Sequence, residues 1–214
     1  MAKLPSGILG PVSGKIGPVI GGVWKGIPYI KEVDQNPKKK KKTERQLANE
    51  AKFKFINEWL VPLHPFFTVG FYKLAVGKTT IAAGLSANYQ NVFTGIYPDL
   101  NIQLDEMIIC SGKLPMVNNP RAEFVQPDQL KFCWDKNSIK GTQYTDQIMV
   151  ALFNPEEGFC DGFIGGVSRS AEQYLFKLGE ESIGKPLHVY IGAFSLDRNK
   201  ISNSQYIGQI APTL

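Results

Sequence analysis

The most enzyme-like segment of this chain is Gly77-Lys78-Thr79-Thr80, which ends as a phosphate-binding loop does. Such a loop needs a further glycine five positions before Gly77, where backbone amides wrap the phosphates, and Tyr72 occupies that position. The nearest glycine, Gly70, gives the wrong loop length, and no aspartate at the end of a second hydrophobic strand is present to hold magnesium. We interpret the segment as a surface turn that leads into the residues after Ile81.

The other groups that could do acid, base or metal chemistry are scattered. His64 and His188 are the only histidines, and neither has a second His, Cys or carboxylate at metal-ligand spacing. Adjacent carboxylates occur at 105–106 and 156–157, and in an extended chain the members of each pair would point to opposite faces. We therefore expect no enzymatic activity, no catalytic residues, no cofactor and no metal site.

Three cysteines, Cys110, Cys133 and Cys160, are an odd number without Cys-x-x-Cys spacing. This pattern favours buried thiols in a reducing compartment over a disulfide framework. Gly and Pro interrupt the N-terminus, so no secretory signal is visible, and no run approaches the roughly 20 apolar residues of a membrane span. We expect a soluble protein that is synthesised in the cytoplasm.

Positive charge is concentrated near the N-terminus. Residues 1–60 carry 12 Lys and Arg against 5 Asp and Glu, whereas the remainder carries 12 against 14. The densest part is a run of five lysines before an expected helix: Lys38, Lys39, Lys40, Lys41 and Lys42. Their charges oppose the helix dipole, so an anion would relieve them. Three interpretations stay open: a solvated linker, contact with an acidic protein partner and, ranked after these, contact with nucleic acid.

The first thirty residues contain seven glycines and two Gly-Pro steps, with β-branched residues between them. This composition predicts short extended pieces joined by turns. Such an arm has little core of its own, so we expect it to gain order by packing on another copy of the chain. The expected intersubunit contact residues are Ile16, Val19, Ile20, Val23, Trp24, Ile27 and Tyr29.

A helix is predicted to start after Thr43, with Gln46 completing a capping box and apolar residues recurring every four positions from Leu47 to Trp59. Pro62 and Pro65 should end it. The aromatic segment 66–74 fits a buried helix or a strand equally well. A further helical or irregular segment is expected at 81–93, and a turn at 94–98.

From Asn101 the pattern changes to short strands rich in aromatic and β-branched residues. Seven are expected, near 102–110, 129–135, 146–153, 158–165, 171–178, 186–195 and 203–210. Three of them alternate so that one face is apolar, with triplets at 130, 132 and 134, at 148, 150 and 152, and at 174, 176 and 178. The predicted class is α+β and mainly β: a Gly-rich N-terminal arm (1–36), a Lys-rich linker and helical region (37–98), and an immunoglobulin- or fibronectin-like antiparallel β-sandwich (99–214).

Several motifs follow one another along nearly the whole chain: Ser-Gly-Lys-Ile-Gly at 13–17, Trp-Lys-Gly-Ile at 24–27, Thr-x-x-Gln-x-x-x-x-Ala-Lys-Phe at 43–53, Val-Gly-Phe at 69–71, Thr-Gly-Ile-Tyr-Pro at 94–98 and Ser-Asn-Ser-Gln-Tyr at 202–206. Together they resemble an uncharacterised family of the Bacteroidota, domain of unknown function 6266. That resemblance implies no activity and no catalytic residues.

The glycine-rich start and Trp-Lys-Gly are also similar to phage virion proteins in which an Asn-Pro-x-Thr-x-x-Gln helix follows. Here five lysines separate Asn-Pro from Thr43. This second similarity implies a subunit of a phage-like particle, tail, tube or filament. Our first hypothesis is therefore a structural subunit that forms homo-oligomers through its arm. The alternative is a non-enzymatic binding module whose basic N-terminal region contacts nucleic acid or an acidic protein.

Overall fold

The computed structural model describes residues 3–4, 7, 10–24, 26–33, 41–136 and 139–212. The chain divides into two compact units, residues 1–43 and 44–214, each of which is described by itself. The first unit is an antiparallel sheet of β1 (Gly14–Ile16), β2 (Val19–Trp24) and β3 (Ile27–Glu32), in that order. Gly17 and Gly26 occupy the two turns with φ of 55° and 83°, which only glycine adopts readily. The predicted extended pieces joined by turns are confirmed.

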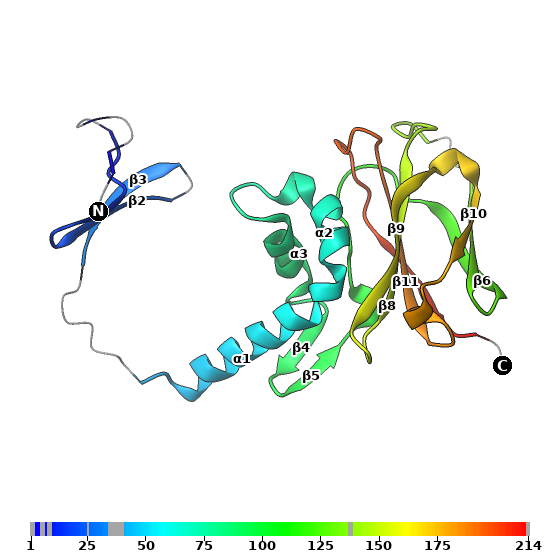
Figure 1. The fold of residues 1–214 in the computed structure, drawn as a ribbon, viewed down its shortest axis with the longest axis horizontal. Helices are drawn as coiled ribbons and strands as arrows, with labels where there is room; N and C mark the ends of the chain where they lie inside the picture. The colour runs from blue at the N-terminus through cyan, green and yellow to red at the C-terminus, as the bar shows by residue number, and fades with distance from the viewer. Residues whose placement is uncertain are drawn as a thin grey trace. The chain divides into compact units, whose positions relative to one another are not determined.

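The second unit has three layers (Figure 1). Its middle layer is a four-stranded antiparallel sheet in the order β12-β11-β8-β9. Three helices cover one face of this sheet, and a three-stranded sheet in the order β10-β7-β6 covers the other. The helices are α1 (Glu44–Trp59), α2 (His64–Gly70) and α3 (Thr80–Asn88). The strands are β6 (Asn118–Gln126), β7 (Gln129–Asp135), β8 (Gln147–Asn154), β9 (Phe159–Ser168), β10 (Gln173–Lys177), β11 (Leu187–Phe194) and β12 (Gln205–Ile210).

Strand β8 joins the three layers because both of its faces are buried. Ile148, Val150 and Leu152 enter the core between the two sheets, where they meet Leu130, Phe132 and Trp134 of β7. The residues that alternate with them, Met149, Ala151 and Phe153, enter a second core beneath the helices. Of the three alternating triplets predicted from the sequence, those at 130–134 and 148–152 are therefore confirmed, and Phe176 and Leu178 of the third also pack in the core between the two sheets. A strand covered on both sides loses the polar positions that mark a solvent-facing strand.

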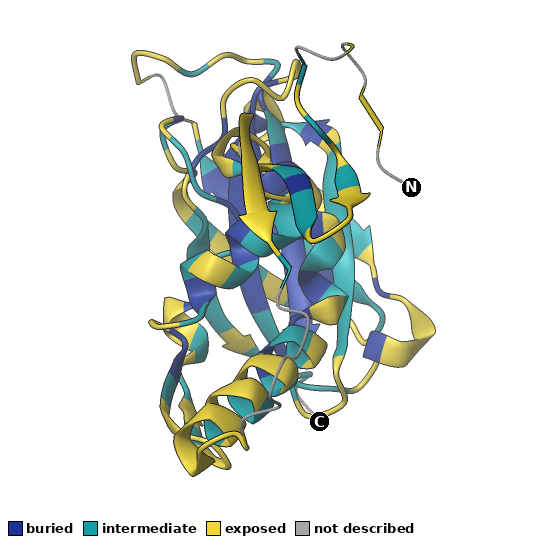
Figure 2. Cartoon of the chain, turned by 90° about the vertical axis from the view of Figure 1, so that its left-hand side faces the viewer, coloured by how far each residue is buried: buried dark blue, intermediate teal, exposed yellow. Residues whose placement is uncertain are grey.

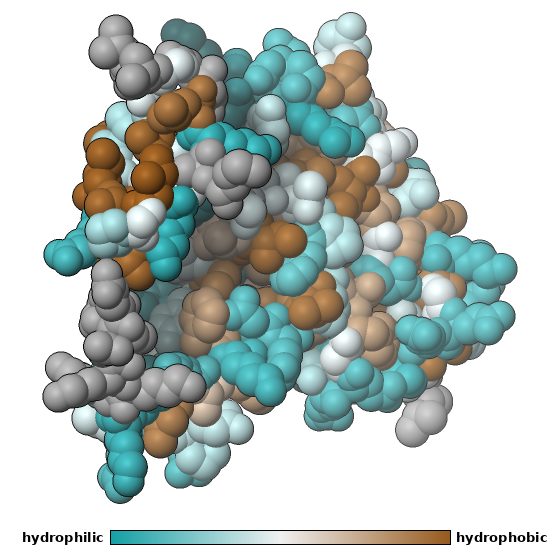
Figure 3. Space-filling model, turned by 60° about the vertical axis from the view of Figure 1, so that its left-hand side comes forward, coloured by the Kyte–Doolittle hydropathy of each residue, from teal (hydrophilic) through white to brown (hydrophobic). Residues whose placement is uncertain are grey.

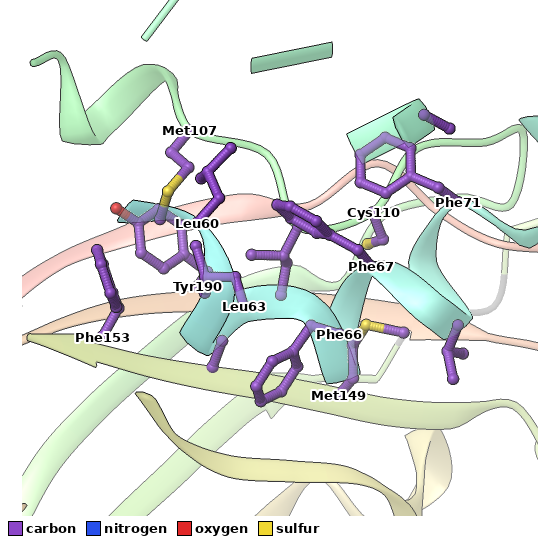
Figure 4. Packing of buried hydrophobic residues seen from close by; sticks show 14 of the residues in the cluster. Leu60, Leu63, Phe66, Phe67, Phe71, Met107, Cys110, Met149, Phe153 and Tyr190 are labelled. Atoms are coloured by element: carbon purple, nitrogen blue, oxygen red, sulfur yellow. The ribbon is translucent and has the colours of Figure 1, made fainter. Parts of the chain in front are cut away.

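The helical layer packs on the sheet through aromatic side chains (Figure 4). The Trp59 ring meets the rings of Phe93 and Phe153 edge-on, with centroids 5.0 and 4.8 Å apart. The ambiguous aromatic segment is α2, whose Phe66 and Phe67 are buried. Gly84 lets α3 approach α2 closely, since a Cβ there would lie 2.5 Å from the Phe67 ring. Helix and sheet thus share one hydrophobic core.

Helix α1 begins and ends where the sequence predicts, but only its C-terminal half is packed. Phe55, Ile56 and Trp59 contact the core, whereas Leu47 is 52% exposed. Figure 2 shows the first turns of α1 as mostly exposed. The four-residue apolar periodicity therefore predicts the helix correctly and overestimates how much of it is buried.

Two segments differ from the expected strands. The turn expected at 94–98 joins a short hairpin, β4 (Phe93–Ile96) and β5 (Asp99–Ile102), and the strand expected at 102–110 is wrong beyond Ile102. There, a 3₁₀ turn (Leu104–Glu106) follows, and the backbone of Ile108 bonds to the side chain of a buried asparagine instead of to a ladder. Strand β6 was missed because Asn-Asn-Pro suggests a turn. It lies at a sheet edge, where proline is tolerated.

The buried asparagine, Asn88, ties α3 to the segment that leads into the sandwich. Its Nδ2 donates to the carbonyls of Gly84 and Ile108, each at 2.9 Å, and its Oδ1 accepts from the Ile108 N–H at 2.9 Å. Asn88→Ala leaves the Ile108 backbone groups without these partners, so we expect the free energy of unfolding in urea to fall by about 2–3 kcal/mol. Asn57→Ala on exposed α1 is the control and should change it by less than about 0.5 kcal/mol. Equal effects would contradict the assigned role.

The class predicted from sequence is confirmed at its coarser level: the chain is α+β, mainly β, with antiparallel sheets that pack as a sandwich. Helices α1, α2 and α3 share a core with β8 and β11. The boundary expected near residue 98 stays a prediction about folding units.

Candidate functional site

The N-terminal sheet has apolar side chains on both faces. The strand register places residues opposite one another on the same face. One face, the aromatic face, carries Ile20, Trp24, Ile27 and Tyr29, with Lys15 and Lys31 among them. The other, the aliphatic face, carries Ile16, Val19, Val23, Pro28 and Ile30. The seven predicted contact residues are therefore divided, four on the aromatic face and three on the aliphatic face.

The segment that precedes β1 in the same chain lies over part of the aliphatic face. A Cβ at Gly21 would lie 2.3 Å from the carbonyl oxygen of Val12, so the segment before β1 crosses this face in direct contact with the strand. Gly21 is the one buried position among the described residues 10–33. On the aromatic face the Tyr29 ring lies across Gly22, 3.0 Å from where a Cβ would be. Gly21 and Gly22 thus allow Val12 and the Tyr29 ring to lie directly against β2 on opposite faces of the sheet.

Most apolar side chains of this sheet are at the surface. Trp24 and Ile27 are each 63% exposed, and Ile30 is 67% exposed. Figure 3 shows hydrophobic side chains gathered on the surface of this unit. A three-stranded sheet normally needs one face packed on a core to be stable in water. Contiguous exposed apolar surface of this kind marks an interaction site.

The lysine run lies only partly within the described residues. Lys41 and Lys42 are exposed ahead of α1, and Lys38, Lys39 and Lys40 lie outside the described residues. The basic patch as a whole therefore stays a prediction from the sequence.

A cavity of about 480 Å³ in the second unit was not foreseen from the sequence. It lies between the 3₁₀ turn Tyr72–Leu74, the segment 111–115, the loop at 140–141 and the turn before Ile201. Four lysines from these four segments line it: Lys73, Lys113, Lys140 and Lys200. They are up to 127 positions apart in the sequence, 200 against 73, so no local pattern could have grouped them.

One wall of this cavity is fixed by a buried arginine. Arg169 is 3% exposed, and its Nη2 donates to the carbonyl of Pro115 at 2.6 Å. Its own carbonyl accepts from Trp134 Nε1 at 2.6 Å. Burial lowers the pKa of the Arg169 guanidinium, and the charge of Asp146 opposes that shift. The side chain therefore acts as a cross-link between the sandwich and the 111–115 segment.

Comparison with known protein families adds one result. A model described as a family of unknown function (DUF6266) matches residues 11–208. This chain belongs to DUF6266. The match includes the whole N-terminal sheet and all four lysines of the cavity, so both features lie within the DUF6266 region. No curated protein matches the chain.

In this DUF6266 chain the phosphate-loop-like segment is part of a helix connection. It follows a 3₁₀ turn and precedes α3, whereas a phosphate-binding loop follows a strand. Thr79 is the N-cap of α3, and its hydroxyl accepts from the Ala82 N–H at 3.1 Å. The side chain that would reach magnesium in a nucleotide site is used here to cap the helix.

The described thiols are unpaired, with Cys110 buried and Cys133 and Cys160 half-buried. Burial raises the pKa of the Cys110 thiol to about 12, and it also raises that of Cys160. Across the described ranges, no three His, Cys, Asp or Glu side chains lie together as metal ligands would. Among the described helices, none has the length and apolar character needed to cross a membrane.

His188 lies on β11 with its Nδ1 2.8 Å from the hydroxyl of Tyr206. Burial lowers its pKa, with an opposing effect from Glu156, and burial also lowers the pKa of His64. The unfolded chain therefore binds these protons at higher pH than the folded chain. Stability is complete above the unfolded pKa of about 6.5 and is lost as the pH falls below it.

We expect the urea midpoint of the wild-type protein to fall between pH 7.5 and pH 5.5, and the fall to be smaller in His188→Gln. Carboxylates stay ionised across most of this range, so their contribution is small. The same measurement on His64→Gln gives the part of the fall in urea midpoint that is due to His64. An equally steep fall in both variants would show that neither histidine is the cause.

Proposed function

We propose that this protein is a structural subunit that assembles with copies of itself through its N-terminal sheet. The observation that carries the proposal is the exposure of apolar side chains on a sheet with no core of its own: Trp24 and Ile27 each have 63% of their surface exposed. Covering that surface removes apolar area from water, which favours association by roughly 25 cal/mol per Å². The aromatic face is the docking face, since segment 11–13 already lies over the other.

The receiving surface that we propose is the outer face of the three-stranded sheet β10-β7-β6 in the next copy. Leu175 is 57% and Val125 51% exposed there, although most of the neighbouring apolar residues of this sheet are buried in the sandwich. They line a depression of about 750 Å³ together with Glu123 and Lys131, whose charged groups are 3.9 Å apart. An apolar floor with a polar rim suits a protein contact.

This contact would join two different surfaces, so the association is head-to-tail. Head-to-tail contacts close into rings or continue as filaments, depending on the rotation between successive copies. A ring, tube or filament is also what the similarity of the first residues to phage virion proteins implies. The edges of β1 and β3 provide additional main-chain groups for pairing between copies.

We further propose that the sandwich is of the immunoglobulin or fibronectin kind. The strand order supports this. β6–β7, β8–β9 and β11–β12 are neighbours within a sheet, whereas the chain crosses between sheets after β7, β9 and β10. Such crossovers are typical of Greek-key sandwiches, which often serve as building modules of larger assemblies.

Size-exclusion chromatography with light scattering tests the assembly directly. At tens of micromolar the protein should have a mass at least twice the 23.8 kDa of one chain, and electron microscopy should show rings, tubes or fibres. A purely monomeric full-length chain under these conditions overturns the proposal.

A further inference from the structure

The four-lysine cavity has the chemistry of an anion site. Lys73, Lys113, Lys140 and Lys200 line it, and no Asp or Glu is among the described residues that do so. None of the four ammonium groups has a carboxylate within 4.0 Å in the described part of the chain. Four like charges around one hollow repel one another, and an anion bound there removes the repulsion.

Asp197 is the carboxylate nearest in sequence to Lys200, and its hydrogen bonds are made within its own turn. Asp197 accepts from Ser195 Oγ at 2.5 Å and from the Asn199 N–H and Nδ2 at 2.9 and 2.7 Å. These bonds lower the pKa of Asp197 to about 2. Asp197 and Asp146 line an adjacent cavity that Lys200 also lines, and neither aspartate lines the four-lysine cavity.

The floor of the cavity is apolar and held by backbone hydrogen bonds. Leu114, Ile201 and Leu74 contribute aliphatic surface. Leu114 N–H donates to the Ile201 carbonyl at 2.9 Å, and Gly112 N–H donates to Asn203 Oδ1 at 3.0 Å. A Cβ at Gly112 would lie 2.1 Å from the Ile201 oxygen, so only glycine permits this approach. An apolar floor beneath cationic groups would bind a molecule that has both an apolar and an anionic part.

We infer that this cavity binds a small phosphorylated organic molecule, with its apolar body on Leu74, Leu114 and Ile201 and its phosphate among the four lysines. A volume of about 480 Å³ is in the range of small-molecule sites. A dianionic phosphate gains from several ammonium groups at once, whereas a monocarboxylate gains about half as much Coulomb energy. The inference is independent of the assembly proposal because the site shares no residue with the aromatic face or with the depression on β10-β7-β6.

Isothermal titration calorimetry of the full-length protein with 1-naphthyl phosphate tests the site. We expect saturable 1:1 binding per chain that weakens with added salt, and weaker binding of both inorganic phosphate and 1-naphthoate. The double variant Lys113→Gln, Lys140→Gln should raise the dissociation constant about tenfold. Leu74→Ser should weaken 1-naphthyl phosphate but leave inorganic phosphate unchanged.

The matched control is Lys54→Gln, Lys177→Gln, which removes the same charge from exposed positions outside the cavity. It should leave the dissociation constant within about twofold of the wild type. Equal weakening in the two double variants would show general attraction to a basic protein and overturn the inference. So would the absence of saturable heat up to about 5 mM ligand. Preferential binding of a single-stranded oligonucleotide that the cavity variant abolishes would also overturn it, in favour of a nucleic-acid surface.

Discussion

Ile27→Glu is expected to convert the assembled protein into monomers, whereas Ile30→Glu is expected to leave it assembled. Both side chains lie on β3 and are similarly exposed, at 63% and 67%. The register places Ile27 on the aromatic face and Ile30 on the aliphatic face. A carboxylate buried in an apolar contact without a partner costs about 2–4 kcal/mol, so the dissociation constant should rise by about 30-fold to 700-fold for Ile27→Glu alone.

Sedimentation velocity over a concentration series measures this difference. Leu175→Glu should have the same effect as Ile27→Glu if the outer face of β10-β7-β6 is the receiving surface. Lys54→Glu on α1, outside both proposed surfaces, is the control for added charge and should leave the protein assembled. If Ile30→Glu dissociates the protein and Ile27→Glu does not, the docking face has been assigned to the wrong side of the sheet.

Salt separates the apolar contact from the basic alternative. Docking through the aromatic face should persist or strengthen as salt rises, because apolar association is not screened. An interaction through the lysines before α1, with nucleic acid or an acidic protein, should weaken steeply over the same range. Association that disappears at moderate salt and survives Ile27→Glu would favour the binding module over the structural subunit.

Phe153→Ala should give the largest loss of stability. Phe153 is fully buried on β8 and meets the Trp59 ring edge-on at 4.8 Å. Removing a buried phenyl ring leaves a cavity, and such changes cost about 3–5 kcal/mol. Because β8 serves the helical core on one face and the sandwich core on the other, we expect both layers to lose stability together.

Hydrogen exchange measured by mass spectrometry, combined with urea unfolding, tests this coupling. Peptides from α2 and from β7 should lose protection in one transition, in the wild type and in Phe153→Ala. Leu152→Ala, whose side chain enters the core between the two sheets, should shift the same single transition. Loss of protection in the helices alone would instead support a folding boundary near residue 98.

Local chemistry was sufficient to predict most elements. Thr43 before an apolar four-residue repeat predicted α1, and the glycine content of the first thirty residues predicted extended pieces joined by turns. Gly17 and Gly26 occupy two of these turns with positive φ. Strict alternation at 130, 132 and 134 predicted the inward face of β7. The prediction of a strand at 102–110 was wrong because the backbone of this segment bonds to the distant side chains of Asn88 and Ser204. The periodicity of apolar residues carries no information about such contacts.

The sequence by itself determined the apolar, glycine-rich N-terminal strands and the mainly β composition. Only the tertiary structure decided that Ile27 and Ile30 face opposite sides, that β8 is buried on both faces, and that Lys73, Lys113, Lys140 and Lys200 surround one cavity. The physical reason is distance along the chain. Patterns of two or four residues follow from local backbone geometry, whereas contacts between residues far apart depend on how layers pack.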